Sequence, residues 1–238
     1  MALPASLSVI SDSCFARCTG LETVFIPDSV TEICDSAFFS CVMLQSVSLP
    51  DSVTRLGSYV FDNCTSLASV RISNSLSEIS DRVFHGCSAL KALAIPSSVT
   101  KIGDYAFNGC TALDTFKIPY SVKEIGCCAF DGCTALCSVD IPGSVGRIGD
   151  YAFYRCMALE SVVLPAGLIN TGEKVFKSCT GLKTVTLPAS VQEIGYAAFD
   201  GCSALETVIY KGSKEQWKNV RIESLNAPLT NLNIIFES

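Results

Sequence analysis

The stretch "SVTKIGDYAFNGCTAL" at residues 98–113 returns almost unchanged further along the chain. Close copies are "SVKEIGCCAFDGCTAL" at 121–136, "SVGRIGDYAFYRCMAL" at 144–159 and "SVQEIGYAAFDGCSAL" at 190–205. The starting positions differ by 23 residues or by twice that number. Self-similarity at a fixed period predicts one structural unit that is used again and again.

Three residue types keep the 23-residue step over nearly the whole chain, and we call each such set of equivalent positions a column. The phenylalanine column is Phe15, Phe38, Phe61, Phe84, Phe107, Phe130, Phe153, Phe176 and Phe199. The cysteine column, three places later, is Cys18, Cys41, Cys64, Cys87, Cys110, Cys133, Cys156, Cys179 and Cys202. The leucine column begins at Leu21. A period between 20 and 29 residues with an L-x-x-V-x-I core predicts a leucine-rich-repeat solenoid. We expect a right-handed coil of about nine repeats, with a parallel sheet on its concave face.

One repeat, residues 21–43, predicts the path of a single coil. "LETVFIP" at 21–27 alternates apolar and other residues with a period of two, which indicates a short strand ended by proline. "DSVTEIC" at 28–34 indicates a turn and a short extended piece on the opposite side. "DSAFFSC" at 35–41 spaces its inward residues as one turn of an α- or 3₁₀-helix would.

Such a coil buries only about seven side chains, so coils must stack to close a core. Strands in a parallel sheet lie about 4.8 Å apart, so nine coils give a rod roughly 40 Å long. Opposite charges alternate along one column, as expected for neighbours at cross-strand distance. That column is Glu32, Arg55, Glu78, Lys101, Glu124, Arg147, Asn170 and Glu193.

The repeat changes after Leu205, and the last residues predict a cap. We expect one continuous domain made of a solenoid at 3–210 and a cap at 211–238. "SKEQWKNV" predicts a short helix that starts after Ser213, with Trp217 against the last coil. "NLNIIFE" predicts a final strand, and together these segments would cover the last apolar face.

The opening "MALPASLSVISDSCFARC" begins inside a repeat and lacks the basic region and apolar block of a signal peptide. We therefore expect a native leader and earlier repeats outside this sequence. An uncapped edge exposes strand groups that invite pairing, which predicts self-association through residues 3–20.

Two positions break the repeat within the solenoid. Thr171 stands where other repeats have isoleucine or leucine, and Gly167 replaces a recurring serine. A polar group at a core position must find a partner or turn outward. The sequence therefore predicts a local distortion at residues 167–173.

Composition excludes two classes of partner. The net charge is −6 and the pI is about 4.8, whereas nucleic acids and anionic membranes attract clustered lysine and arginine. Hydrophobic residues make up 49% and the mean hydropathy is +0.40. No apolar run approaches the roughly 18 residues of a membrane span, so no membrane insertion is expected.

Fourteen cysteines would suggest disulfides in a secreted protein. The nine periodic ones should instead form a buried row of small thiols, because stacked equivalents have parallel Cβ vectors. We interpret Cys14 and Cys34 as substitutions in columns of small residues. Cys127, Cys128 and Cys137 are expected to face solvent. A redox or metal site at these thiols is the alternative, but no zinc spacing and no nearby histidine supports it. We expect neither metal nor cofactor.

The single histidine, His85, lies two residues from Cys87 and invites a Cys–His nucleophile hypothesis. The Cys87 thiol should point inward, and the column of His85 is otherwise mixed and solvated. No other catalytic motif stands out. We therefore expect no catalytic residues and no enzyme.

A binding solenoid keeps its core constant and varies one outer face. The most varied column of the strand face lies beside a column of small residues, which predicts a shallow, accessible strip. The alternative is a merely solvated sheet. The predicted binding residues are Phe25, Ser48, Arg71, Lys117, Asp140, Val163 and Thr186. Elsewhere, Tyr59, Tyr105 and Tyr151 recur on alternate repeats, either as a contact ridge or packed on one another's flanks.

The phrase "SVTKIGDYAFNGCTALDTFKIP" resembles the BspA-like leucine-rich repeats and their IG..AF..C..L....IP pattern. The resemblance covers residues 3–210, and "YKGSKEQW" is similar to the segment that closes many such arrays. It implies a bacterial cell-surface or secreted protein that adheres to host or neighbouring-cell proteins. A glycan is the alternative partner that we consider. It supplies no catalytic residues. The alternatives are a structural spacer and, last, an enzyme.

Overall fold

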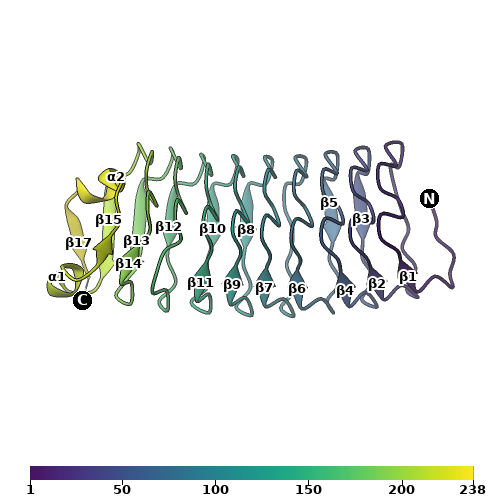
Figure 1. The fold of residues 1–238 in the computed structure, drawn as a ribbon, viewed down its shortest axis with the longest axis horizontal. Helices are drawn as coiled ribbons and strands as arrows, with labels where there is room; N and C mark the ends of the chain where they lie inside the picture. The colour runs from purple at the N-terminus through teal and green to yellow at the C-terminus, as the bar shows by residue number, and fades with distance from the viewer. Residues whose placement is uncertain (238) are drawn as a thin grey trace.

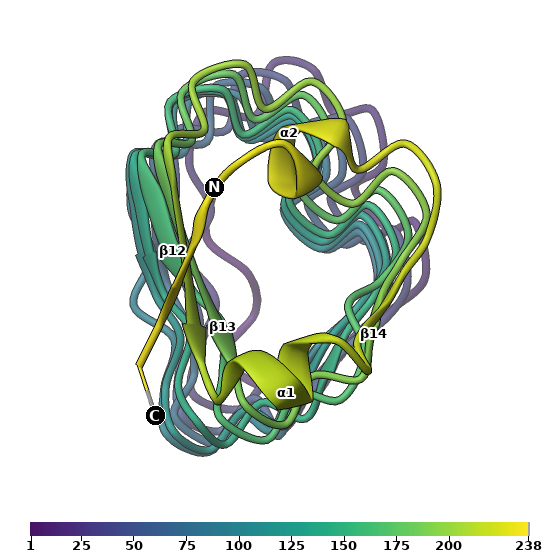
Figure 2. The ribbon, with the colours of Figure 1, turned by 90° about the vertical axis from the view of Figure 1, so that its left-hand side faces the viewer.

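The computed structural model describes residues 1–237 as a rod of stacked coils (Figure 1). Each repeat makes one turn, and the turns follow a nearly straight axis. Viewed along this axis, successive coils superimpose on one closed outline, whose interior is filled by the apolar side chains of every repeat (Figure 2). The predicted leucine-rich-repeat solenoid is thereby confirmed.

One wall of the rod carries the strands predicted from the alternating pattern, and we call it the strand face. These strands are β3 (Ser46–Ser48), β5 (Ser69–Arg71), β8 (Thr115–Lys117), β10 (Ser138–Asp140), β12 (Ser161–Val163), β13 (Thr184–Pro188) and β15 (Thr207–Lys211). Their pairing is parallel and in register at 23 residues, as in Val47 with Val70 and Val162 with Val185.

The opposite wall carries the second extended piece of each coil. These strands are β1 (Val9–Ile10), β2 (Glu32–Ile33), β4 (Arg55–Leu56), β6 (Glu78–Ile79), β7 (Lys101–Ile102), β9 (Glu124–Ile125), β11 (Arg147–Ile148) and β14 (Glu193–Ile194). The second residue of each strand is buried, while the first residue, from β2 onward, belongs to the predicted charge column. Arg55 pairs with Glu32 and Arg147 with Glu124, which confirms the register of this column.

The predicted one-turn helices are wrong, because the segment equivalent to 35–41 forms tight turns instead. Ser36 and Ser40 have positive φ values of 57° and 56°, and equivalent residues repeat this along the chain. The backbone N–H groups of Ser36, Phe38 and Ser40 donate to carbonyls of residues 58–62 at 2.7–2.9 Å. A helix needs these groups for its own hydrogen bonds. Alternate N–H groups therefore link coils rather than extend a helix.

The phenylalanine column forms the centre of the core. From Phe15 to Phe199 the rings stack face to face, with neighbouring centroids 5.2–5.8 Å apart. Beside them the thiols of the cysteine column point inward, and that of Cys110 donates to the Phe84 carbonyl at 3.1 Å. The predicted row of buried thiols is confirmed from Cys41 to Cys202. Cys18 is exposed, because only one coil packs on it within residues 1–237.

The distortion predicted at residues 167–173 is confirmed as a break in the second wall. In regular coils the glycine N–H donates to the preceding coil, as Gly149 does to Ile125 at 2.9 Å. The N–H of Gly172, the equivalent glycine, makes no backbone hydrogen bond within residues 1–237, and the Thr171 N–H donates to the Glu193 carbonyl of the following coil at 3.1 Å. Its Oγ1 accepts from the Gly195 N–H at 2.9 Å, so the buried hydroxyl finds the partner that it needs.

The strand face is also interrupted. Its strands form three separate sheets, β3 with β5, β8 with β10, and β12 with β13, β15 and β17 (Ile234–Phe236). Residues 91–96, between β5 and β8, form no strand, and β10 does not pair with β12. These breaks coincide with the hollows described below.

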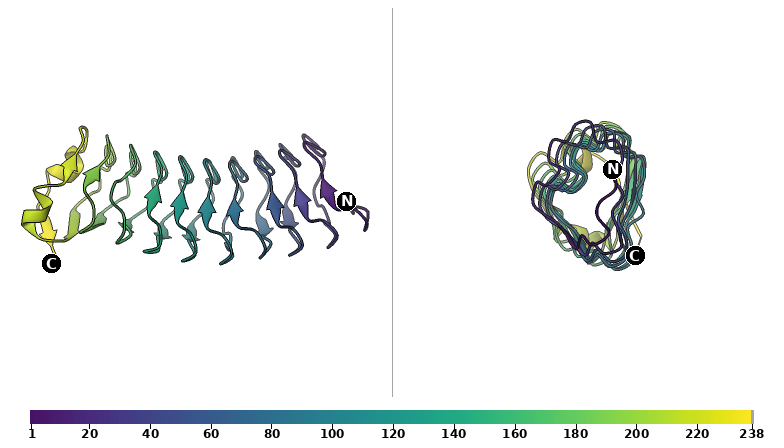
Figure 3. Two further views of the ribbon diagram at one scale, coloured as in Figure 1. Left: turned by 60° about the horizontal axis from the view of Figure 1, so that its bottom comes forward. Right: turned by 90° about the vertical axis from the view of Figure 1, so that its right-hand side faces the viewer.

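The last residues close the end of the rod (Figures 2 and 3). The helix expected after Ser213 is α1 (Lys214–Trp217), held by a reciprocal capping box between Ser213 and Gln216. It is followed by β16 (Arg221–Ile222), which pairs with β14, and by α2 (Ala227–Thr230). Asn226 Oδ1 accepts from the Phe199 N–H at 3.0 Å, where other coils offer a backbone carbonyl. The final strand, β17, pairs with β15.

In the part of the chain described, residues 1–237, no helix has the length and apolar character needed to cross a membrane.

Candidate functional site

The strand face displays most of the predicted binding residues. Phe25 is 67% exposed and Val163 is 61% exposed, far more than large apolar side chains of the core. The other exposed members are Ser48, Arg71, Lys117 and Asp140. Thr186 is much less accessible, at 7% exposed, although it lines one of the hollows described below, and its role as a contact residue stays a prediction. It pairs between Val163 and Ile209, whose larger side chains flank it.

Two adjoining hollows lie over the second half of this face. The first, of about 590 Å³, is lined by Thr115, Lys117, Ser138, Asp140, Ile141, Ser161 and Val163, among others. The second, of about 410 Å³, shares Ile141 and Val163 and extends to Lys211. We call the two together the strand-face groove. It combines an apolar floor with hydroxyl groups and with charges of both signs.

A third hollow, of about 350 Å³, lies where residues 91–96 form no strand, between Arg71 and Pro96. Arg71 is fixed there by two 3.0 Å contacts to the Asp51 carboxylate and by a 2.6 Å hydrogen bond to the Leu49 carbonyl. The Asn74 N–H and then the Arg71 guanidinium lower the pKa of Asp51. A guanidinium that is already held in place loses little side-chain entropy on binding a partner.

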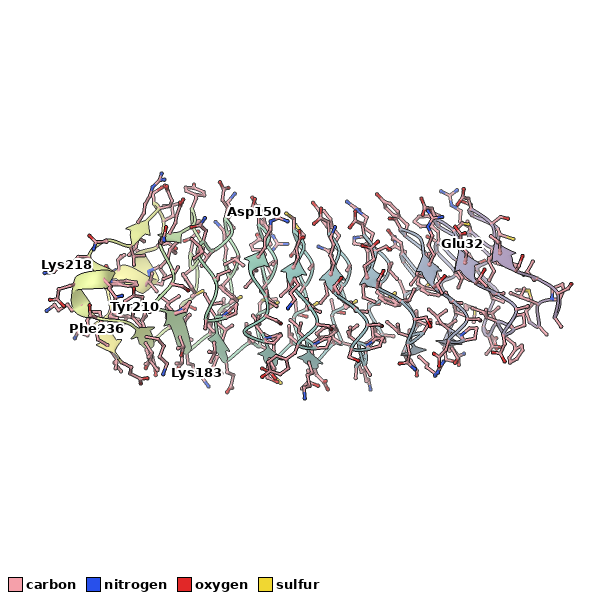
Figure 4. The ribbon with its side chains drawn as sticks, turned by 90° about the horizontal axis from the view of Figure 1, so that it is seen from below. Glu32, Asp150, Lys183, Tyr210, Lys218 and Phe236 are labelled. Atoms are coloured by element: carbon pink, nitrogen blue, oxygen red, sulfur yellow. The ribbon has the colours of Figure 1, made fainter. Side chains whose placement is uncertain are left out.

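The other long side of the rod carries the tight turns, and we call it the turn face. Figure 4 shows Asp150, from a tight turn, on one side and Lys183, next to strand β13, on the other. On the turn face Arg82 lies between two rings, with Cζ 4.3 Å from the Tyr105 centroid and 5.5 Å from that of Tyr59.

Lys174 repeats this arrangement, with Nζ 4.8 Å from the Tyr151 centroid and 5.4 Å from that of Tyr196. The tyrosine rings therefore pack against cations of the neighbouring coils rather than on one another, and the contact ridge stays a prediction. Sequence reasoning missed the cations. The sequence did contain a signal for these cations, because Arg82 and Lys174 occupy the tyrosine column in coils that adjoin coils with a tyrosine there.

The Cys–His pair does not form a nucleophile. Burial raises the pKa of Cys87 well above its ordinary value, and its thiol donates to the Phe61 carbonyl at 3.1 Å. His85 Nδ1 lies 3.0 Å from Asp62 Oδ1 instead. The expectation of a solvated column around His85 is wrong at Asp62, which is 3% exposed and bonded to both His85 and Asn63. A reactive thiol needs exposure and a lowered pKa, and Cys87 has neither.

The non-periodic cysteines differ in exposure. Cys137 is exposed and Cys127 is half-buried, but Cys128 is 9% exposed, so the expectation that it faces solvent is wrong. Its short side chain stands between the taller Tyr105 and Tyr151 of the flanking coils. Throughout the described chain the fourteen cysteines are free. No group of three His, Cys, Asp or Glu side chains that could hold a metal ion occurs within residues 1–237.

The family of BspA type leucine rich repeat regions matches residues 1–114 and 100–224, in six copies. The chain belongs to this family. Of the curated proteins, none matches it.

Solved structures are similar to this BspA-type chain as well. The T. pallidum leucine rich repeat protein is 32% identical with a TM-score of 0.56, over 77% of this chain and 78% of that one. The pneumococcal vaccine antigen PcpA has a TM-score of 0.59 at 21% identity, over 100% of this chain and 67% of its own, and so shares the fold. A leucine rich cell surface protein from Faecalibacterium prausnitzii is 28% identical, with a TM-score of 0.46, over 92% and 81% of the two chains.

The BspA-type chain thus presents two chemically varied sides around a uniform core. The strand face offers Phe25, Val163 and a groove with charges of both signs. The turn face offers tyrosines and cations already stacked on one another. The column thiols from Cys41 to Cys202 lie in the interior, where burial raises the pKa of thiols such as Cys110 and Cys133.

Proposed function

We propose that this chain is a non-enzymatic binding module that holds a protein or a glycan on its strand face. The observation that carries the proposal is the exposed, varied column over an otherwise repetitive core, from Phe25 to the strand-face groove. Solenoids bind in this way, with a constant interior and one variable outer surface.

The residue types of the column support a protein partner. Aromatic and arginine side chains dominate the binding energy of protein interfaces, and Phe25 and Arg71 supply one of each. The neighbouring column consists of small residues, which lets a partner approach the sheet closely. The net charge of −6 argues against nucleic acid.

Membership of the BspA-type family supports a place at the bacterial cell surface or in the secreted fraction, where the partner would be a host or neighbouring-cell protein. No feature of the site calls for a cofactor. Self-association through residues 3–20 stays a prediction, which light scattering of the purified chain measures.

The test is a binding screen of the chain against immobilised extracellular-matrix proteins and a glycan array. The strand-face variant replaces Phe25, Arg71, Lys117 and Asp140 together by alanine. We expect the wild-type chain to bind at least one of these surfaces, and the variant to bind it at least tenfold more weakly. Tenfold corresponds to about 1.4 kcal/mol, which is modest for four contact residues.

A matched control replaces four exposed residues of the opposite wall by alanine. These are Glu78, Lys123, Arg147 and Ile169. The control should bind as the wild type does. Equal loss in both variants, or loss in the control alone, would place the binding surface elsewhere. A chain that binds nothing on either panel would favour the alternative of a rigid spacer, which the regular stacking of coils also suits.

A further inference from the structure

The third hollow of the strand face, of about 350 Å³, lies at a break in the sheet, because residues 91–96 form no strand. In a regular coil the residue after the strand donates its N–H to the following coil, as Leu49 does to the Arg71 carbonyl at 2.9 Å. Ile72 is the equivalent residue and lines the hollow, but its N–H makes no hydrogen bond within residues 1–237. The break therefore leaves a backbone donor free at the hollow.

A second free donor borders the same gap between coils. The Phe25 N–H donates to the Met1 carbonyl of the preceding coil at 2.8 Å, but the equivalent N–H of Ala94 has no hydrogen-bond partner in the described chain. The register thus directs the Ile72 N–H toward the following coil and the Ala94 N–H toward the preceding one. Both point into the gap between their two coils. Backbone donors of this kind need a partner, from water or from a ligand.

Two cations flank Ala94 in the varied column of the strand face. Arg71 belongs to the coil before it and Lys117 to the coil after it, so their Cα atoms lie two coil spacings apart, roughly 10 Å. All three residues are exposed. Ala94 is the shortest side chain of the three, so it leaves room above its methyl group between the two long cationic side chains. The hollow lined by Arg71 and Ala94 is that room on the Arg71 side.

Both cations have donors to spare. A guanidinium has five N–H donors, and the three contacts of Arg71 to the Asp51 carboxylate and the Leu49 carbonyl leave at least two of them free. Lys117 forms no ion pair within residues 1–237, although Asp140 is its register partner in the next coil. No acidic side chain lines the hollow. Because Asp51 offsets the charge of Arg71, the site offers the net charge of a single cation.

We propose that the third hollow binds a carboxylate side chain, aspartate or glutamate, of a partner protein on the strand face. The carboxylate oxygens accept hydrogen bonds from the free N–H groups of Ile72 and Ala94 and from the Arg71 guanidinium, while Lys117 adds a positive charge. Such charge-assisted contacts are short and strong, and backbone N–H groups are a recurring means of carboxylate capture. A carboxylate carries one charge, which matches the site better than a doubly charged phosphate. This proposal rests on the function proposed above, because it names the chemistry of the partner on the same face.

The experiment follows the backbone amides of the full ¹⁵N-labelled chain by NMR during a titration with short peptides. The first peptide has one glutamate among glycines and serines, with both ends blocked, so that its side chain is its only charge. The second has glutamine, a neutral isostere, in place of the glutamate. The Ile72 and Ala94 amide signals should shift in a saturable way, with a Kd at least tenfold lower for the glutamate peptide. Raised salt should weaken its binding, as for other exposed charge contacts.

Two variants test the site, with the Ile72 amide as the readout. Lys117→Gln removes the unpaired cation and should weaken the glutamate peptide at least fivefold. Lys123→Gln, which makes the same change at an exposed lysine of the opposite wall, should leave its binding unchanged. Ala94→Ile fills the room between the cations and should weaken the peptide at least tenfold. The strand face accepts isoleucine in this column, since Ile209 stands there in the last repeat, and thermal unfolding shows that the variant folds.

The proposal is overturned by equal affinity for the two peptides, by no saturable shift with either, or by wild-type affinity in Ala94→Ile. Equal loss in Lys117→Gln and Lys123→Gln would mean that the peptide responds to net charge alone, which also overturns it. Tighter binding of a glutamine peptide with a free C-terminal carboxylate would assign the hollow to a chain end instead of a side chain.

This result is independent of the binding screen. If the strand-face variant loses a target in the screen but the Ile72 and Ala94 amides do not respond to the glutamate peptide, the carboxylate site fails and the proposed function stands. If those amides respond as expected but the strand-face variant keeps every target, the site stands and the proposed function fails.

Discussion

Phe107→Ala is expected to lower the free energy of unfolding by about 3–5 kcal/mol, the usual cost of removing a large aromatic side chain from a core. The ring is fully buried and stacks between Phe84 and Phe130, with centroids 5.5 and 5.3 Å away. It also meets the tilted ring of Phe116 at 4.9 Å. Coils on both sides are held by their own hydrogen bonds, so the cavity cannot collapse fully.

Urea denaturation followed by circular dichroism measures this loss, with Trp217 fluorescence as a local probe of the C-terminal end. Phe25→Ala is the matched control, because its ring is 67% exposed. It should change the unfolding free energy by no more than about 0.5 kcal/mol. If the two variants were equally stable, the phenylalanine column would not be the centre of the core.

Gly126→Ala is expected to destabilise the chain by about 1–3 kcal/mol, the typical cost of overpacking. A Cβ atom there would lie 2.6 Å from the Asp104 backbone nitrogen and 2.6 Å from the Gly103 carbonyl carbon. Both contacts are backbone atoms of the preceding coil. That coil cannot retreat without breaking the 2.8 Å hydrogen bond from the Gly126 N–H to the Ile102 carbonyl.

Gly146→Ala is the control for this substitution, since a Cβ atom at Gly146 would meet nothing within 4 Å. Alanine there should leave stability unchanged or raise it by about 0.4–1 kcal/mol, because it restricts the unfolded chain. Thermal unfolding of the two variants gives the comparison. A loss of similar size in both would mean that close approach between coils is not the reason for glycine at Gly126.

The register of the fold was predictable from the sequence. Because each coil must cover the apolar side of the one before it, a 23-residue step without insertions places equivalent residues directly above one another. The inward phenylalanine and cysteine columns follow from that, and so does the break at Thr171, where a hydroxyl stands in an apolar column. The exposed positions of Phe25 and Val163 follow from strand alternation alone.

Other features depend on neighbours in adjacent coils and were not predictable from one repeat. The tight turns replace the expected helices because half of their N–H groups bond between coils, as at Phe38. Thr186 and Cys128 are buried because larger side chains flank them in the next coils. The cation sandwiches at Arg82 and Lys174 likewise join residues that lie a full coil apart.

Hydrogen exchange of individual backbone amides tests the central claim, a single continuous stack in register, most directly. The N–H groups of the phenylalanine column from Phe38 to Phe176 each donate to the next coil at 2.7–2.9 Å. They should exchange slowly and at similar rates, at intervals of 23 residues. Leu93 to Ile95, whose N–H groups make no backbone hydrogen bond within residues 1–237, should exchange quickly. Slow amide exchange that is confined to one part of the chain, or that lacks the 23-residue period, would contradict a single continuous stack.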